Sequence, residues 1–333
     1  MSKSVKIALD AMGGDSGPAV VVPAALGMLD KNPDLEVILV GQTERIEPYL
    51  AGGSSRARII DAREVVAMDD KPGEALRKKK DSSLRVAVNL VKENAADACV
   101  SAGNTGALMA TSKFVLKTVA GIDRPAIMGA IPTVEGHTYM LDLGANADCN
   151  AENLFQFGVM GSVVASVIEN IERPRVALLN IGAEEIKGNS TVREAAAMLS
   201  ESDLNYVGFV EGDGVGRHKA DVIVCDGFTG NVALKVMEGT ASLVSHFIKK
   251  GSGIGLYGRF SGLISLPVLN GLRHSLDPRH YNGASLVGLT GIVVKSHGGA
   301  DVVAFQQAIR VAMLEVEKRV PETIQNMLVV QEH

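Results

Sequence analysis

Residues 5–15 read VKIALDAMGGD, a short apolar run that ends in an aspartate and a glycine-rich turn. The same arrangement, followed by residues that favour a helix, recurs five more times along the chain. The other apolar runs lie at 98–101, 139–143, 176–181, 221–225 and 291–295. Continuous apolar runs are typical of strands that are buried on both faces of a mostly parallel sheet. Strands that alternate with helices predict an α/β fold.

The turns after these runs are the places where the sequence concentrates Gly, Asn and Asp. In open α/β sheets, ligands bind at the carboxyl ends of the strands. We therefore expect all six turns to follow strand ends, and we expect several of them to converge on one cleft.

The composition excludes several classes of protein. A chain of 333 residues with 46% hydrophobic and 21% charged residues has enough material for about two domains or lobes. A net charge of −5, no Trp and only 8 Phe and 5 Tyr argue against a nucleic-acid binder, which needs a basic surface and exposed rings. The three cysteines form neither a CxxC pair nor a zinc spacing. The first residues, MSKSVKIALD, lack the apolar core of an export signal, so we expect a cytoplasmic protein.

One segment departs from the alternation of apolar runs, glycine-rich turns and helical segments. Residues 251–283 carry many Leu, Ile, Val and Phe side chains among glycines, with arginines and histidines between them. The pattern predicts an inserted apolar helical hairpin. Such a hairpin either packs in a dimer interface, which is apolar at its core, or lies on an anionic membrane as a peripheral contact.

The turn Ser101-Ala-Gly-Asn-Thr-Gly106 is the first candidate binding site. Its glycines allow a ligand to approach the backbone closely, and the N–H groups at the start of the following helix favour an anion. Asn104 and Thr105 add side-chain donors. An ordinary helix cap is the alternative interpretation. No Gly-Lys-Ser/Thr follows, so the turn is not a P-loop.

Single basic or titratable residues occur in other turns. Lys187 stands between Glu and Gly residues, where it either stabilises a phosphate or carbonyl oxygen or is a solvated surface lysine. His297 precedes two glycines and is either an oxyanion donor or a structural hydrogen-bonding residue. The run Lys78-Lys79-Lys80 is either a solvated helix face or a docking site for an acidic macromolecule.

Carboxylates and cysteines do not combine into a recognisable catalytic or metal site. Asp10, Asp142 and Asp226 flank turns, but no pair has the spacing of helical metal ligands, so we predict no metal. Cys149 has no histidine near it in the sequence that would activate a thiolate. We therefore interpret it as a small buried side chain.

Taken together, the turns indicate a family. The ordered blocks are Asp10–Asp15, Ser101–Gly106, Leu141–Asn146, Asn180–Gly188, Asp226–Asn231, and Tyr281–Ala284 with His297–Gly298. This set resembles the PlsX family, the acyl-ACP:phosphate acyltransferases of bacterial phospholipid synthesis. The resemblance extends from Ile7 to about Val320 and is weakest between Gly251 and Pro278.

The resemblance implies transfer of a long-chain fatty acyl group from acyl carrier protein to inorganic phosphate, which gives an acyl phosphate. It also implies a homodimer that supplies a membrane-bound glycerol-3-phosphate acyltransferase. The implied fold is a two-lobed α/β/α sandwich like those of isocitrate and isopropylmalate dehydrogenases and phosphotransacetylases. We expect lobes at about 1–100 plus 290–333 and at 101–289, around a cleft. Because phosphate is already anionic, direct attack on the thioester requires neither an enzyme nucleophile nor a cofactor.

The candidate residues then receive roles. The phosphate-binding set is Asp10, Gly103, Asn104, Thr105, Gly106, Asn146 and Asp226. We expect Lys187 to stabilise charge, Asn231 to orient the acyl carbonyl or the pantetheine arm, and His297 to add a polar contact. The lysines Lys78, Lys79 and Lys80 are expected to dock the carrier protein.

Three alternatives stay open at this point. A phosphate acetyl- or butyryltransferase would use acyl-CoA and would need a pocket for a short acyl chain and the adenosine phosphates. A non-catalytic scaffold would recruit acyl carrier protein to membranes. A metal-dependent decarboxylating dehydrogenase would share the fold, but the sequence lacks the arginine-rich carboxylate site and the metal-ligand pairs that it requires.

Overall fold

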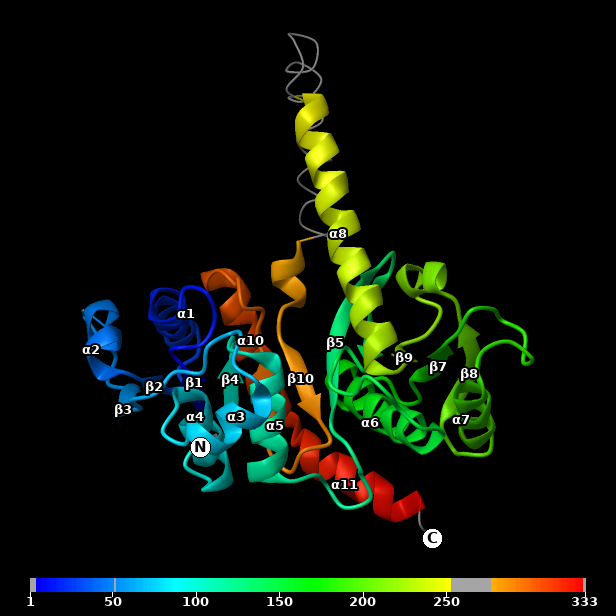
Figure 1. Ribbon diagram of the computed structural model, residues 1–333, viewed down its shortest axis with the longest axis horizontal. Helices are drawn as coiled ribbons and strands as arrows, with labels where there is room; N and C mark the ends of the chain where they lie inside the picture. The colour runs from blue at the N-terminus through cyan, green and yellow to red at the C-terminus, as the bar shows by residue number, and fades with distance from the viewer. Residues whose placement is uncertain (1–3, 51, 253–276, 332–333) are drawn as a thin grey trace.

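The computed structural model describes residues 4–50, 52–252 and 277–331. They form one eleven-stranded sheet with helices on both faces (Figure 1). The strand order is β3-β2-β1-β4-β11-β10-β5-β6-β9-β7-β8. The predicted α/β fold with a mostly parallel sheet is confirmed.

The sheet consists of two parallel sets that are joined by antiparallel pairings. The first set contains β1 (Val5–Asp10), β2 (Leu35–Gly41), β3 (Ala57–Asp61), β4 (Ala98–Ser101) and β11 (Ile292–Lys295). The second set contains β6 (Gly136–Leu141), β7 (Arg175–Leu179), β8 (Asn205–Val210) and β9 (Val222–Val224). Between them lie β10 (Ala284–Val287) and β5 (Ala126–Thr133), and the pairings β11–β10, β10–β5 and β5–β6 are antiparallel. The second set therefore runs opposite to the first.

All six glycine-rich turns follow strands, as the sequence predicts. They leave the sheet at two edges, because the two parallel sets run in opposite directions. The turns after β1, β4 and β11 form the first turn group, and those after β6, β7 and β9 form the second turn group.

Helices cover both faces of the sheet. On one face lie α1 (Pro18–Lys31), α6 (Ala151–Glu169), α7 (Ser190–Ser200), α10 (Val302–Lys318) and α11 (Val320–Gln331). On the other lie α3 (Pro72–Lys78), α4 (Ser83–Lys92), α5 (Thr105–Leu116) and the start of α8 (Gly227–Ser252), around a core cluster that reaches across both parallel sets. The short elements are α2 (Thr43–Ile46), η1 (Glu47–Tyr49), η2 (Gly212–Arg217) and η3 (Pro278–Tyr281).

Two helices bear on the predicted organisation of the chain. The helix α5, which the boundary expected at residue 101 assigns to the second lobe, packs against α3 and α4 beside the first parallel set. The helix α6 has the length and hydropathy of a membrane span, but 67% of its most apolar window is buried inside the protein. Such burial is typical of a core helix.

The helix α8 begins against the sheet and then extends away from the body of the molecule (Figure 1). Large apolar side chains recur along one side of it, and each is at least 46% exposed. They are Phe228, Val232, Val236, Leu243 and Phe247, and they fall within an arc of about 100° around the helix axis. We call this the α8 stripe. Most of the hairpin expected at 251–283 lies outside the described residues.

Candidate active site

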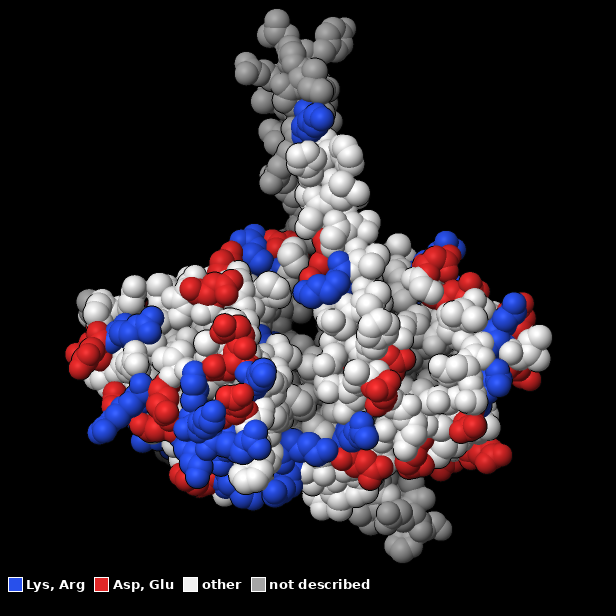
Figure 2. Space-filling model, in the orientation of Figure 1, with Lys and Arg blue, Asp and Glu red and all other residues white. Residues whose placement is uncertain are grey.

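A cavity of about 930 Å³ lies between the two parallel sets. Its walls come from the first turn group, the turn after β6, β5, η3 and α8, and Figure 2 shows the surface hollowed between the two halves. The wall that the first turn group provides is polar and includes Thr105, Lys295 and His297. The walls along β5 and α8 form a largely apolar groove. Its lining includes Ile127, Ile131, Pro132, Leu234, Met237 and Val244.

The polar wall is built on three neighbouring parallel strands. Asp10, Ser101 and Lys295 are paired in register at the ends of β1, β4 and β11. Ser101 Oγ donates to Asp10 Oδ2 at 2.6 Å and accepts from the N–H of Gly103 at 3.0 Å. A side chain at Gly13 would meet the Gly103 nitrogen at 2.7 Å, so the two turns can pack this closely only with glycine at position 13. The buried Asp10 carboxylate therefore braces the first turn group.

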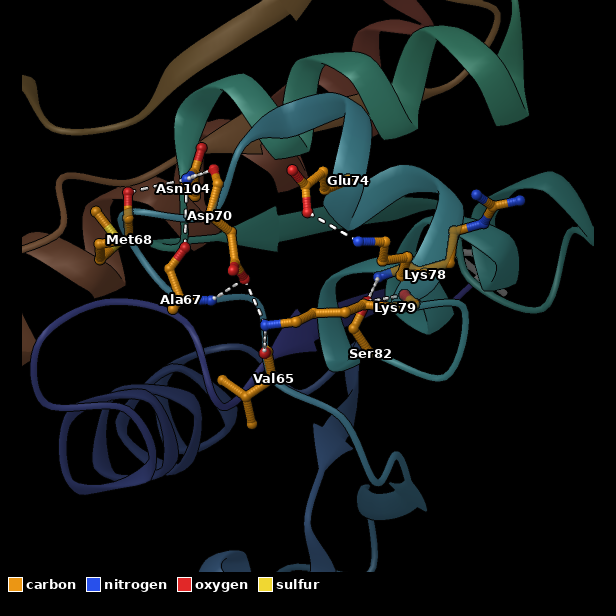
Figure 3. Close-up of polar contacts among 10 residues, drawn as sticks. Val65, Ala67, Met68, Asp70, Glu74, Lys78, Lys79, Ser82 and Asn104 are labelled. Atoms are coloured by element: carbon orange, nitrogen blue, oxygen red, sulfur yellow. Dashed lines mark hydrogen bonds and ion pairs between the residues drawn. The ribbon is translucent and has the colours of Figure 1, made fainter.

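Asn104 caps α5 and holds a neighbouring loop against it. Its Oδ1 accepts from the N–H of Ala107 at 3.0 Å, which is the geometry of a helix N-cap. Its Nδ2 donates to the carbonyl oxygens of Ala67, Met68 and Asp70 (Figure 3). The protein itself thus occupies the polar atoms of this side chain, and the helix-cap interpretation fits Asn104 better than direct phosphate binding.

The start of α5 and the turn after β11 complete the polar wall. Thr105 is exposed and lines the cavity, and the first-turn N–H groups of Thr105 and Gly106 have no intrahelical acceptor. His297 also lines the cavity, and its Nδ1 accepts from the N–H of Gly299 at 3.1 Å. In neutral His297 the proton is therefore on Nε2, which leaves that nitrogen as a donor.

Lys295 is a site residue that the sequence analysis missed. Its side chain is only 9% exposed, yet it lines the cavity. Its Nζ donates to the carbonyl oxygen of Ala102 at 3.3 Å and to that of Ser296. Burial lowers the pKa of Lys295 to about 8. The available signal was a lysine at the last position of a buried strand, where a charge rarely occurs without a function.

The second turn group closes around its own carboxylate. Asp142 is fully buried and accepts five hydrogen bonds of 2.6–3.2 Å. Four come from the N–H groups of Ile127, Gly144, Ala145 and Asn146, and the fifth comes from Asn146 Nδ2. Leu143 and Gly144 of this turn line the cavity, but Asn146 does not, although the sequence analysis assigned it to phosphate together with the first turn group. Its amide is used to hold Asp142.

The start of α8 packs directly on this turn. Asp226 caps the helix, because its Oδ1 accepts from the N–H of Thr229 and its Oδ2 from the Thr229 hydroxyl, both at 2.8 Å. A side chain at Gly230 would lie 1.9 Å from the Asp142 carbonyl oxygen, so only glycine permits the contact. The close approach brings Asn231 into the wall of the cavity, whereas Asp226 does not line it.

Lys187 lies on the loop after β7 and does not line the cavity. Its side chain is exposed, and within the described part of the chain its ammonium has no hydrogen bond or ion pair. The loop is held instead through the backbone, where Asn180 Nδ2 donates to the Lys187 carbonyl oxygen at 3.3 Å. The structure thus places Lys187 in the second turn group, apart from the polar wall.

Neither a reactive thiol nor a metal cluster is visible. Burial, together with the nearby Asp142 carboxylate, raises the pKa of Cys149 to about 11, so this thiol is neutral at pH 7. Within the described residues, no group of three His, Cys, Asp or Glu side chains is arranged to hold a metal ion.

The three consecutive lysines have different environments, and Figure 3 shows those of Lys78 and Lys79. Lys78 forms an ion pair with a glutamate one turn away on α3, and Lys80 is exposed. Lys79 is directed inward, where its Nζ pairs with Asp70 and donates to a backbone carbonyl oxygen at 2.9 Å. Lys79 therefore supports the loop that Asn104 also holds, and its ammonium is not free to dock a partner, contrary to the expectation from the sequence.

Comparison with solved structures shows the class of fold. A phosphotransacetylase from Streptococcus pyogenes superimposes with a TM-score of 0.63 at 19% identity, covering 95% of each chain. A branched-chain phosphotransacylase from Enterococcus faecalis does so with a TM-score of 0.59 at 14% identity, covering 94% of this chain and 99% of the other. The chain therefore has the mixed α/β fold that is found in phosphotransacylases.

Sequence comparison places the chain more narrowly. Residues 5–323 match the family described as fatty acid synthesis protein. A phosphate acyltransferase from Alkalilimnicola ehrlichii is 60% identical over 332 residues, which cover 98% of this chain and 97% of that protein. One from Methylococcus capsulatus is 58% identical, covering 96% and 95%. The chain belongs to this family, the PlsX family, and it is an enzyme of the acyltransferase class.

Proposed function

We propose that the protein transfers a long-chain fatty acyl group from the thioester of acyl carrier protein to inorganic phosphate. The observation that carries the proposal is the cavity, in which an apolar groove meets a polar wall. Side chains such as Ile131, Leu234 and Met237 suit an alkyl chain, and the polar wall suits an anion. The relatives named phosphate acyltransferases support phosphate as the acceptor.

In the proposed reaction, an oxygen of hydrogen phosphate attacks the thioester carbonyl carbon. The C–O bond forms, the C–S bond breaks, and the phosphate proton ends on the released carrier thiol. Because phosphate is the nucleophile, no covalent acyl-enzyme is needed. The raised pKa of Cys149 supports this direct route. The protein contributes by holding the reactants in contact and by stabilising the oxyanion.

We assign the thioester side of the reaction to Asn231 and Lys187. Asn231 lines the cavity at the first turn of α8. Lys187 follows β7, the strand beside β9, and its exposed ammonium has no partner within the described residues. A cation without an internal partner is available to the charge that develops on the carbonyl oxygen.

A basic surface supports docking of the acidic carrier protein. Lys and Arg side chains gather over α3, α4 and α5 (Figure 2). Exposed members are Arg77, Lys78, Lys80, Lys113 and Lys117. Among them Phe114 is 54% exposed, with Arg85 and Lys117 5.2 and 4.9 Å from its ring centre. We propose docking on this surface, because Phe114 is one helix length, about 14 Å, from Thr105 at the cavity.

The test is phosphate-dependent release of free carrier protein from palmitoyl-ACP by the purified protein. We expect palmitoyl-CoA and acetyl-CoA to be poorer donors by at least about tenfold in kcat/KM. Faster turnover of acetyl-CoA would support the alternative of a phosphate acetyltransferase. Binding of acyl carrier protein with no release would support a scaffold.

We further propose that the protein is a homodimer through the α8 stripe. Homodimer interfaces are apolar at their core, and contiguous exposed apolar patches mark partner contacts. Light scattering should give a dimer for the wild type and a monomer for Leu243→Glu with Phe247→Glu. Ser245→Glu, an exposed position on the opposite side of α8, is the matched control. A dimeric double variant would contradict this interface.

Finally, we propose a cytoplasmic protein that attaches reversibly to anionic membranes through residues 251–283. The apolar sequence of this segment supports the proposal, because an apolar helix flanked by arginines can lie in a lipid interface. Attachment would place the acyl phosphate beside the membrane acyltransferase that consumes it. The test compares liposome co-sedimentation of the wild type with that of Leu263→Glu with Leu269→Glu. If both stay in the supernatant, or if the variant is merely monomeric, the segment serves the dimer.

A further inference from the structure

The ammonium of Lys295 is a buried cation whose hydrogen bonds are incomplete. An ammonium has three N–H donors, and the carbonyl oxygens of Ala102 and Ser296 accept two of them. Across the described residues, no carboxylate lies within ion-pair distance of its nitrogen. Because the side chain also lines the cavity, the third donor is available to a molecule that binds there.

The carboxylates near Lys295 do not neutralise it directly. Asp10, two strands away, is bonded to Ser101 Oγ at 2.6 Å and to the N–H of Met12 at 3.3 Å, so its oxygens serve the first turn group. Asp15 lines the outer part of the same wall. A buried charge without a bonded partner is costly, and an anion that binds beside it offsets that cost.

We propose that Lys295 is the cation of an anion-binding subsite that holds the phosphate acceptor. The second component is the start of the twelve-residue helix α5, where the N–H groups of Thr105 and Gly106 have no intrahelical acceptor. Lys295 is fixed beside this helix start because it bonds to the carbonyl oxygen of Ala102, which lies in the turn three residues before α5 begins. The Nε2 donor of His297 is the third component.

The subsite binds and orients phosphate and forms no covalent bond. Lys295 and Lys187 then have separate tasks: Lys295 holds the acceptor, whereas Lys187 acts on the charge that develops on the carbonyl oxygen. This inference rests on the proposed function for the identity of the anion. It adds that Lys295 and the polar wall of the cavity receive the phosphate.

The test is calorimetric titration of the full-length protein with inorganic phosphate at pH 7. Lys295→Met has the length of lysine and no charge, and we expect its phosphate Kd to rise at least tenfold. Lys92→Met makes the same change at an exposed position outside the cavity, and its Kd should match that of the wild type. A Kd within twofold of the wild type for Lys295→Met would overturn the subsite.

A second measurement needs no folded variant. The phosphate Kd of the wild type should rise at least tenfold between pH 8 and pH 9.5, because Lys295 loses its proton in this range while phosphate stays almost entirely a dianion. Lys187→Met should show the same rise. A Kd that does not change up to pH 9.5 would overturn the assignment of the cation.

Inorganic phosphate and the phosphate of the pantetheine arm share the same chemistry, so 4′-phosphopantetheine is titrated as a separate arm of the experiment. Loss of its binding in Lys295→Met, with binding of inorganic phosphate intact, would overturn the assignment to the acceptor. A wild type that binds phosphate through Lys295 but releases no carrier protein from palmitoyl-ACP would contradict the proposed function and leave the subsite in place.

Discussion

The two turn groups have similar sequences, and each buries a carboxylate that accepts hydrogen bonds from the chain, but only the first also buries a cation. In the first turn group Asp10 accepts from Ser101 and Met12, and the ammonium of Lys295 contacts two carbonyl oxygens and lines a cavity. In the second turn group the carboxylate of Asp142 accepts five hydrogen bonds from the chain itself. The cation makes the first group open to an anionic ligand, whereas Asp142 occupies the donors of the second.

This difference teaches that a turn rich in Gly and Asn after a strand is not by itself an anion site. Backbone N–H groups of such turns bind the nearest anion. After β6 that anion is Asp142, which belongs to the turn. After β4 the anion is Asp10, which bonds to Ser101 from the neighbouring strand, and β11 adds the positive charge of Lys295. The character of each site is therefore set by the neighbouring strand.

The largest effect should follow from removing the Asp142 carboxylate, which holds the second turn group together. Asp142→Ala removes the acceptor of five donors, and we expect it to lower the free energy of unfolding by roughly 3–5 kcal/mol. Asp226→Ala, which removes only the cap of α8, should cost about 1 kcal/mol. Urea denaturation followed by circular dichroism measures both. A loss below about 1 kcal/mol for Asp142→Ala would show that the hydrogen bonds to Asp142 do not hold the second turn group together.

In the first turn group the effect on stability should have the opposite sign, because loss of the Lys295 charge should stabilise the fold. Lys295 has a pKa of about 8, below its ordinary value, so between pH 8 and about 10.4 the unfolded chain binds more protons than the folded one. Wild-type stability should therefore rise with pH in this window. Asp10 and Asp15 favour the charged form of Lys295, and Lys235 opposes it.

Lys295→Met removes this titration. Without phosphate at pH 7, we expect the variant to be more stable than the wild type by up to about 3 kcal/mol, from 1.36 kcal/mol per pKa unit. The difference should shrink as the pH rises to about 10. Urea denaturation of both proteins at several pH values measures it. A variant that is less stable than the wild type at pH 7 would contradict the picture of an unsatisfied buried charge.

The exposed Lys187 tests whether it and Lys295 have separate tasks. Lys187→Ala should lower turnover at least about 100-fold, the size expected for removing one charge-stabilising donor, while the phosphate Kd stays within twofold. Steady-state kinetics and calorimetry on the same preparation test both parts. A loss of turnover below about tenfold, with an intact circular dichroism spectrum, would make Lys187 a structural residue of its loop.

The sequence predicts six of the eleven strands, the glycine-rich turns that follow them and the family, because apolar runs and turn motifs are local. It does not predict the division of the turns into two groups, since this depends on β10 and β5 pairing antiparallel. Lys295 escapes notice because its burial results from packing against Ala102, nearly 200 residues away in the chain. The helix-cap interpretation of Asn104 was available from the sequence, but the bonds of its Nδ2 were not, because the loop that accepts them is more than 30 residues away in the chain.

The smallest effect concerns the basic surface over α3, α4 and α5, beside the first turn group. Lys78→Glu with Lys80→Glu should raise the KM for palmitoyl-ACP about fivefold at low salt and leave kcat within twofold, because rim charges govern encounter. The effect should fade at about 200 mM salt, where exposed charges are screened.

Lys79→Met is the informative contrast. Its ammonium holds Asp70 and the loop on Asn104, so it should lower kcat, and this effect should not depend on salt. If Lys79→Met instead raised KM in a salt-dependent way, Lys79 would belong to the docking surface, and the inward ion pair would not persist in solution.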